Sequence, residues 1–357
     1  MPIAKQDLRR DTLRKLQSKD KTGLIDLRLQ YSEAQKLLTG YINKLVNVNR
    51  IYPRHLPTQA SFRWSTLEPP ITNWPRACIN SDCIQSEHEW TDQCWSVRDI
   101  LLCDKDEVLI TWDHDNIEGK IHDLIINDQE ALDAHIKGYD LHTITCCKVF
   151  SMSLPSNLRN PHTSNEDIQW RSTYNWQGKD TKQRVLAKNF NHGSKYSKTW
   201  RFVYKIDGIE KYGVSREHLG NLARQYIASK AQAWQAKLSI MSKIQRNRVA
   251  RTLYGGRRIF FTSGEETGRE GFSHMISGTV SDYNNHTLNL LEQQLGNSVR
   301  LLHNAHDGDK IAVKADSIPS LSELKIIIER PVEYQGRSLI MTAGVKVYNN
   351  EANKSIN

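Results

Sequence analysis

Hydrophobic residues along this chain follow two kinds of pattern, one typical of strands and one typical of helices. The stretch 107–113 is apolar and β-branched, which predicts a buried strand ending in Asp113. In the stretch 299–313, two apolar segments flank Asp307 and Gly308, the kind of turn pair that β-hairpins prefer. These patterns predict strands that share one sheet, with Asp307 at the tip of the hairpin.

Helical patterns fill much of the remaining chain. Residues 5–46 are charged and hold leucines at loose helical spacing, which predicts two or three helices broken near Gly23. The stretch 50–75 contains five prolines and is therefore expected to be extended and irregular. One further helix is predicted after the first strand, running through Leu124 and Ala134.

The stretch 184–196 predicts a helix whose weak point is Gly193. Along it, residues that can contact a nucleotide recur at intervals of four: Arg184, Lys188, His192 and Tyr196. On a helix this spacing keeps them on one face, where cations can grip phosphates and flat rings can stack. The stripe suits a nucleoside triphosphate lying lengthwise. The alternative is the ordinary solvated face of a surface helix.

Composition narrows the class of protein. The chain has 357 residues and a formal net charge of +9, and its nine Trp and thirteen Tyr offer flat surfaces, which suits a polyanionic partner. No apolar run reaches the roughly 18 residues needed to span a bilayer, and the N-terminus lacks the apolar core of a signal peptide. Six cysteines in this length do not form a disulfide scaffold. We expect a cytoplasmic protein with no membrane partner.

Four of the cysteines gather in one segment around His88, which raises the question of zinc. They are Cys78, Cys83, Cys94 and Cys103. Their spacing lacks the tight Cys-x-x-Cys pairs that zinc sites usually carry. Free thiols are therefore expected in preference to a structural zinc ion.

Asp113 and Asp307 are the candidate metal ligands. A single Asp at a strand end is commonly a helix cap. Two carboxylates on neighbouring strands, however, form a cradle for two magnesium ions, which can activate an attacking oxygen and stabilise a leaving phosphate. The nearby Asp115 and Asp309 are expected to be solvated or turn-forming.

Five short motifs occur in a fixed order: Arg63…Asn73-x-Pro75, Asp113-x4-Glu118, Asp140-x-His142-Thr143, Arg184-x3-Lys188-x7-Tyr196 and His306-Asp307. This order resembles the family A DNA polymerases, from about residue 28 to the C-terminus. Two more stretches resemble family elements. Residues 251–258 are similar to its threonine-glycine-arginine turn, and Arg269-x3-Ser273-x3-Ser277 is similar to its Arg-x3-Asn-x3-Gln helix.

The resemblance implies an α+β chain with the right-hand polymerase fold: an antiparallel palm sheet, helical fingers and a truncated thumb. The implied segments are a partial helical thumb at 1–55, the first palm part at 56–125 with the cysteine segment 78–103, the fingers at 126–262, and the second palm part with the catalytic hairpin at 263–357.

The resemblance also implies roles for individual residues. Asp113 and Asp307 would bind two Mg²⁺ ions and, with Lys188, carry catalysis. Arg184 and Lys188 would hold the triphosphate, and Glu118 would block the 2′ position of the sugar. The nucleotide site would also include His192 and Tyr196. Primer–template DNA would meet Arg63, Asn73, Arg269, Ser273, Ser277 and His306.

This sequence departs from the family pattern at several positions. His192 replaces an aromatic residue, Ser197 a glycine, Lys120 an arginine, Ser273 and Ser277 an asparagine and a glutamine, and Gly308 a frequent glutamate. None of these changes removes a metal ligand or a phosphate-binding cation, so activity is expected. Fidelity and sugar selectivity are expected to differ from those of the family.

The resulting prediction is a template-directed polymerase that adds dNTPs to a primer 3′ end by two-metal-ion transfer. No 3′–5′ exonuclease domain fits ahead of residue 28. Two arrangements follow: a separate exonuclease chain or processivity factor is a partner, or the enzyme works without proofreading. By analogy with trimmed phage enzymes, the location would be the host cytoplasm. Two alternatives stay open. Glu118 argues against a single-subunit RNA polymerase, and the retained site residues argue against an inactive primer–template-binding subunit.

Overall fold

The computed structural model describes residues 20–57, 59–71, 103–206, 209–304, 307–349 and 354–355, together with Leu13. The chain divides into two compact units. The smaller unit comprises residues 1–56, 65–105 and 348–355, and the larger unit comprises 57–64, 106–347 and 356–357. The predicted metal and nucleotide residues that are described all belong to the larger unit.

The smaller unit contains one long described helix and a pair of short strands. Helix α2 spans Leu24–Gly40 and is followed by the 3₁₀ turn η1, Ile42–Lys44. The helix begins directly after Gly23, which has a positive φ of 73°. The helix break predicted near Gly23 is therefore confirmed on its C-terminal side. Strands β1 (Arg54–Leu56) and β2 (Ser65–Leu67) pair antiparallel.

The sheet of the larger unit is built on the predicted strand and the predicted hairpin. Strand β3 spans Glu107–His114, β6 spans Val299–Asn304 and β7 spans Asp309–Lys314. Strand β10, Ala343–Asn349, completes the order β10-β3-β7-β6. Strands β3, β7 and β6 pair antiparallel, which confirms both predictions. The short β11, Lys354–Ser355, pairs with the end of β10.

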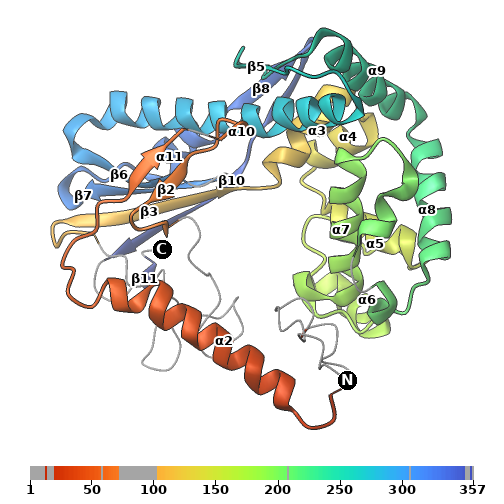
Figure 1. Ribbon diagram of the computed structural model, residues 1–357, viewed down its shortest axis with the longest axis horizontal. Coiled ribbons are helices and arrows are strands. Elements are labelled where there is room, and N and C mark those ends of the chain that lie inside the picture. The colour runs from red at the N-terminus through yellow and green to blue at the C-terminus, as the bar shows by residue number, and fades with distance from the viewer. Residues whose placement is uncertain are drawn as a thin grey trace, which may run out of the picture. The chain divides into compact units, whose positions relative to one another are not determined.

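Two helices cover one side of this sheet. Figure 1 shows α10 (Glu265–Leu295) running along the sheet, with α11 (Leu321–Ile328) beside it. Apolar side chains of both helices form one core with the strands: Val108, Ile110, Trp112, Leu291, Ile311, Val313, Leu324, Ile327 and Ile328. This core fixes the strand ends that carry the predicted metal ligands.

After β3 the chain forms two helices where the sequence predicted one. Helix α3 spans Ile117–Ile126 and α4 spans Gln129–Ile136. Asn127 between them adopts a left-handed conformation with φ of 57°, and the Asp128 side chain caps α4 by accepting from the backbone N–H of Ala131 at 3.2 Å. The single-helix prediction was wrong because an Asn-Asp pair stops one helix and starts the next.

The remaining helices of this unit gather around α7, Lys182–Tyr196, the predicted stripe helix. Gly193, the expected weak point, is a packing position, because a Cβ there would lie 2.8 Å from Phe202 Cδ2. Around α7 lie α5 (Leu141–Val149), α6 (Ile168–Thr173), α8 (Arg216–Ser229) and α9 (Ala231–Asn247). The 3₁₀ turns of this region are η5 (Asn165–Asp167), η6 (Gly178–Asp180), η7 (Trp200–Lys205) and η8 (Ile209–Tyr212).

Two short hairpins and two more turns complete the larger unit. The hairpins are β4 (Val249–Arg251) with β5 (Arg257–Ile259), and β8 (Pro331–Tyr334) with β9 (Arg337–Ile340). The turns are η9 (Gly296–Ser298) and η10 (Ala315–Ser317). The mixture of helices and antiparallel strands confirms the α+β prediction. None of the described helices combines the length and apolar character that a bilayer crossing requires.

Candidate functional site

The two predicted metal ligands lie at the ends of adjacent strands. Asp113 is exposed near the end of β3, and Asp307 is half-buried just before β7. The backbone N–H of His114 donates to the Asp307 carbonyl at 2.7 Å, so the two segments are in direct contact. Gly308 permits this approach, because a Cβ there would lie 1.9 Å from the Trp112 carbonyl oxygen.

Asp115 and Asp309, each two residues from a predicted metal ligand, differ from each other in their surroundings. Asp115 is exposed, as expected, and accepts a hydrogen bond from Thr342 Oγ1 at 3.1 Å. The same threonine accepts from the buried ammonium of Lys120 at 2.6 Å. Asp309 was expected to be solvated or turn-forming, and this was wrong, since it is only 2% exposed within β7. It pairs in the hairpin ladder with Asn304, which is also buried.

The carboxylate oxygens of Asp113 and Asp307 suit magnesium that is bound together with a substrate. Among the described residues, no three His, Cys, Asp or Glu side chains cluster closely enough to form a metal cage. Magnesium is often held by one or two carboxylates, with waters and substrate phosphates as further ligands. Two accessible carboxylates in adjacent segments fit that description. Of the cysteine cluster, Cys78, Cys83 and Cys94 lie outside the described residues, and the described part gives zinc no support.

Glu118 is the centre of a hydrogen-bond cluster that joins four distant parts of the sequence. Its carboxylate accepts hydrogen bonds from Arg63 Nη2, from Tyr196 Oη at 2.9 Å and from Ser277 Oγ at 2.8 Å. The carboxylate and the guanidinium keep 27% and 24% of their side-chain surface exposed. Burial and the adjacent carboxylate raise the pKa of Tyr196 well above its usual value, so the phenol remains a hydrogen donor.

The end of α7 is held against α3 by a buried lysine. Lys195, next to Tyr196, is 7% exposed. Its ammonium lies so close to Gly119 that a Cβ on that glycine would be 2.3 Å from Lys195 Nζ. Burial lowers the pKa of Lys195, although the charges of Asp123 and Glu118 oppose this shift. The glycine directly after Glu118 thus leaves the space that the Lys195 ammonium occupies, and a Cβ there would require the ends of Lys195 and Asn116 to shift. The sequence offered no signal for this contact, because a lysine in a helix is usually solvated.

The predicted stripe of α7 begins in a buried ion pair and then reaches solvent. Arg184 is buried, and its Nε and Nη2 donate to the two carboxylate oxygens of Asp140 at 2.9 and 3.1 Å. Lys188, one turn later, is exposed. His192 is half-buried, with its ring centroid 6.0 Å from that of His142. The four residues thus share a face, but only the later three border accessible space.

His142 is a functional candidate to which the sequence assigned no role of its own. Thr145 Oγ1 donates to the Leu141 carbonyl, so it accepts from Asn191 Nδ2 at 3.0 Å. The second N–H of Asn191 then points to His142 Nδ1 at 3.1 Å. Burial lowers the pKa of His142 to about 3. The ring is therefore neutral and carries its hydrogen on Nε2, as a donor beside His192.

The predicted DNA-facing residues lie in several places. Arg269, Ser273 and Ser277 follow each other at one-turn spacing on α10. Arg269 is exposed and pairs with Glu266, whereas Ser277 is buried and bonded to Glu118. Asn73 and His306 lie outside the described residues.

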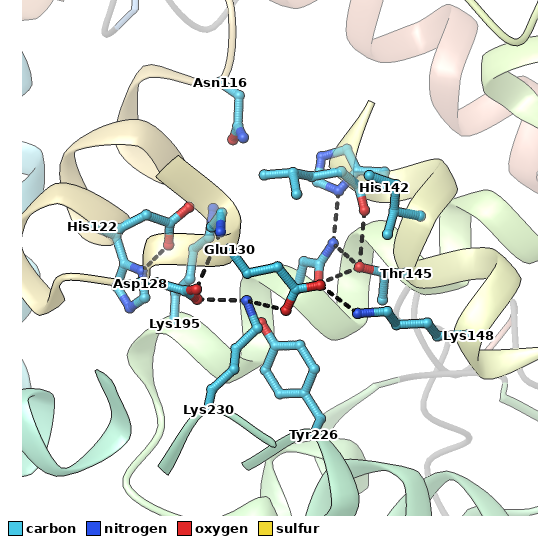
Figure 2. Close-up of a pocket in the computed structure, with 15 residues that line it drawn as sticks. Asn116, His122, Asp128, Glu130, His142, Thr145, Lys148, Lys195, Tyr226 and Lys230 are labelled. Carbon is cyan, nitrogen blue, oxygen red and sulfur yellow. Dashed lines mark hydrogen bonds and ion pairs between the residues drawn. The ribbon is translucent and has the colours of Figure 1, made fainter. Parts of the chain in front are cut away.

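A small cavity is lined by residues of α3, α4, α5, α7 and α8. It has a volume of about 40 Å³, and Figure 2 shows His142, Lys195 and Tyr226 among the residues around it. Lys230 pairs there with Asp128 at 2.6 Å, and Lys148 pairs with Glu130 at 2.6 Å. The volume suits about one water molecule, so this cavity is too small for a nucleotide.

Comparison with known proteins identifies the family. The family model for DNA polymerase family A matches residues 4–335. The solved structure of the POL domain of Pol1 from M. smegmatis, in complex with DNA primer-template and dNTP, is similar with a TM-score of 0.70 and 17% sequence identity. The similarity covers 97% of this chain and 56% of that one, so this chain spans little more than half of its length. A search of curated proteins finds no relative similar in sequence. Because the family model covers most of the sequence, the chain belongs to DNA polymerase family A.

Proposed function

We propose that this chain is a template-directed DNA polymerase that extends a primer 3′ end with deoxynucleoside triphosphates. The observation that carries the proposal is the cluster on Glu118, in which residues from four family motifs meet in one place. Family membership supports the same conclusion. So does the similar M. smegmatis structure, which contains primer-template and dNTP.

The accessible carboxylates would hold the magnesium ions. Asp113 and Asp307 are the ligands, because they are oxygen donors in adjacent segments and both keep some exposed surface. Bound magnesium would lower the pKa of the primer hydroxyl and stabilise the leaving pyrophosphate. The backbone bond from His114 to the Asp307 carbonyl supports this assignment, because it joins the two segments that carry the carboxylates.

The triphosphate would lie along α7. The exposed ammonium of Lys188 would neutralise charge that builds up on the phosphates. Arg184 is buried and paired with Asp140, so its part in nucleotide binding would be to order the starts of α5 and α7. The neutral His142 would donate from Nε2, beside the His192 ring. These groups come from α5 and α7, which pack together, so the phosphate-binding side chains are ordered in advance.

The sugar would meet Glu118. Arg63, Tyr196 and Ser277 fix the carboxylate in one position, where it would occupy the space of a 2′-hydroxyl. A fixed carboxylate discriminates better than a mobile one, because a ribose would have to displace three hydrogen bonds to move it.

Primer extension tests this function and separates it from the alternatives. The chain is incubated with a labelled primer–template and either dNTPs or NTPs, with magnesium or with excess EDTA. The proposal is supported if the primer is extended with dNTPs and magnesium but not with NTPs and not in EDTA. Extension with NTPs in preference would identify an RNA polymerase, and tight DNA binding without extension would identify an inactive binding subunit.

Removal of the Glu118 carboxylate should relax sugar selection. In Glu118→Ala, the ratio of ribonucleotide to deoxynucleotide incorporation should rise by about a hundredfold, since the steric block is gone. The kcat/KM values for one matched NTP and dNTP give this ratio. Glu118→Gln is the matched control, because it keeps the volume and should keep most of the discrimination. An unchanged ratio in the alanine variant would show that Glu118 does not meet the sugar.

A further inference from the structure

Asp140 joins the start of α5 to the stripe helix α7. Its carboxylate accepts hydrogen bonds from both Nε and Nη2 of Arg184. The same carboxylate caps α5 by accepting from the backbone N–H groups of His142 and Thr143 at 3.0 and 3.3 Å. Thr143 Oγ1 adds a bond of 2.8 Å to the same group. The position of one carboxylate therefore sets both the Arg184 guanidinium and the helix end that carries His142.

His162 supplies a further contact to Asp140 and has a defined hydrogen position. Trp176 Nε1 lies 3.1 Å from His162 Nδ1, with the two rings only 9° from parallel. An indole N–H can only donate, so His162 Nδ1 accepts. The neutral ring then carries its hydrogen on Nε2, which lies 3.0 Å from Asp140 Oδ2. Trp176 thus selects the tautomer that can bind Asp140.

The indole of Trp176, which donates to His162, is held in place by packing. Trp176 is 7% exposed and belongs to a small core with Trp170, Cys147 and Ala187, the last of these on α7 itself. The same segment provides the Lys179 carbonyl, which accepts Arg184 Nη1 at 3.1 Å. Asp140 at the start of α5 and Lys179 just before α7 therefore hold Arg184 from two sides.

We propose that Trp176 and His162 are positioning residues for nucleotide binding, which act by fixing Asp140 and through it Arg184 and the start of α5. This inference rests on the proposed polymerase function. A bidentate guanidinium–carboxylate pair needs both groups in one plane. The Nε2–H of His162 holds one oxygen of that plane, so its loss lets Asp140 rotate and the guanidinium follow.

Four variants of the full chain test the proposal by dNTP kinetics. His162→Ala should raise the KM for dNTP about tenfold, the usual consequence of losing a hydrogen bond to a charged group. Trp176→Phe keeps the packing but loses the N–H, and should raise KM severalfold. His162→Gln retains an amide donor and should restore KM to near the wild-type value. Tyr174→Phe is the matched control, because it removes a bond to Ser153 in the same segment and leaves Asp140 untouched. The Kd for primer–template should stay constant throughout.

The outcomes separate positioning from simple packing. The proposal is overturned if His162→Ala and Trp176→Phe lower the melting temperature but keep the wild-type KM, or if His162→Gln is as impaired as His162→Ala. Histidine ¹⁵N NMR provides a readout independent of activity, in which His162 should carry its hydrogen on Nε2 in the wild type. The opposite tautomer overturns this inference and leaves the proposed function intact. A wild-type chain that shows the expected tautomer but extends no primer overturns the proposed function, and the inference with it.

Discussion

Asp113→Ala and Asp307→Ala should each abolish primer extension, with a loss in kcat of at least about a thousandfold. Each variant would remove one of the two carboxylates proposed to hold magnesium at the ends of β3 and β7. The remaining carboxylate cannot organise both the primer hydroxyl and the triphosphate. Single-turnover extension measures the loss, and a filter-binding assay should show that affinity for primer–template is largely kept.

Asp115→Ala is the appropriate control for these two variants. Asp115 is also an exposed carboxylate close to the end of β3, but it is bonded to Thr342. It should retain most of the activity. Asp309 would be a poor control, because it is buried and its replacement would disturb the hairpin. An equal loss from Asp115→Ala would mean that the wrong carboxylates have been assigned to the metals.

Lys188→Ala should raise the activation free energy for dNTP incorporation by about 2–4 kcal/mol, so that kcat/KM falls roughly thirty- to a thousandfold. The exposed ammonium is proposed to stabilise negative charge that grows on the phosphates as the bond to the leaving group breaks. Steady-state extension over a range of dNTP concentrations measures the effect. Binding of primer–template without nucleotide should barely change.

Lys182→Ala provides the matched control for the lysine prediction. Lys182 is also exposed on α7 and has the same charge, but it lies outside the four-residue interval of the stripe. It should keep the wild-type kcat/KM. If Lys188→Ala instead weakens DNA binding and spares the nucleotide KM, then this face of α7 contacts DNA and not the triphosphate.

Local patterns were sufficient to predict the elements that carry the site. Strand β3, the β6–β7 hairpin and helix α7 all have a clear periodicity and each folds as predicted, because neighbouring residues determine them. The same reasoning merged α3 and α4, since it gave too little weight to the turn chemistry of Asn127 and Asp128.

Contacts between distant residues could not be predicted in this way. Arg63 and Ser277 bond to Glu118 from 55 and 159 residues away, and no local pattern predicts these contacts. Nothing in the local sequence distinguishes a side chain that meets a ligand from one that meets another side chain. Buried polar groups such as Lys195 and Asp309 were missed for a related reason, because their residue types are usually solvated.

Gly308 departs from the family pattern, and the close approach of the backbone at this position explains why glycine is required. The family pattern that this sequence resembles often has glutamate here, but in this structure a Cβ at Gly308 would lie 1.9 Å from the Trp112 carbonyl oxygen and 2.9 Å from Asp113 Cα. A substitution that adds a Cβ at position 308 would therefore separate the two carboxylate-bearing segments. Position 308 therefore tolerates a side chain only together with a compensating shift of the end of β3.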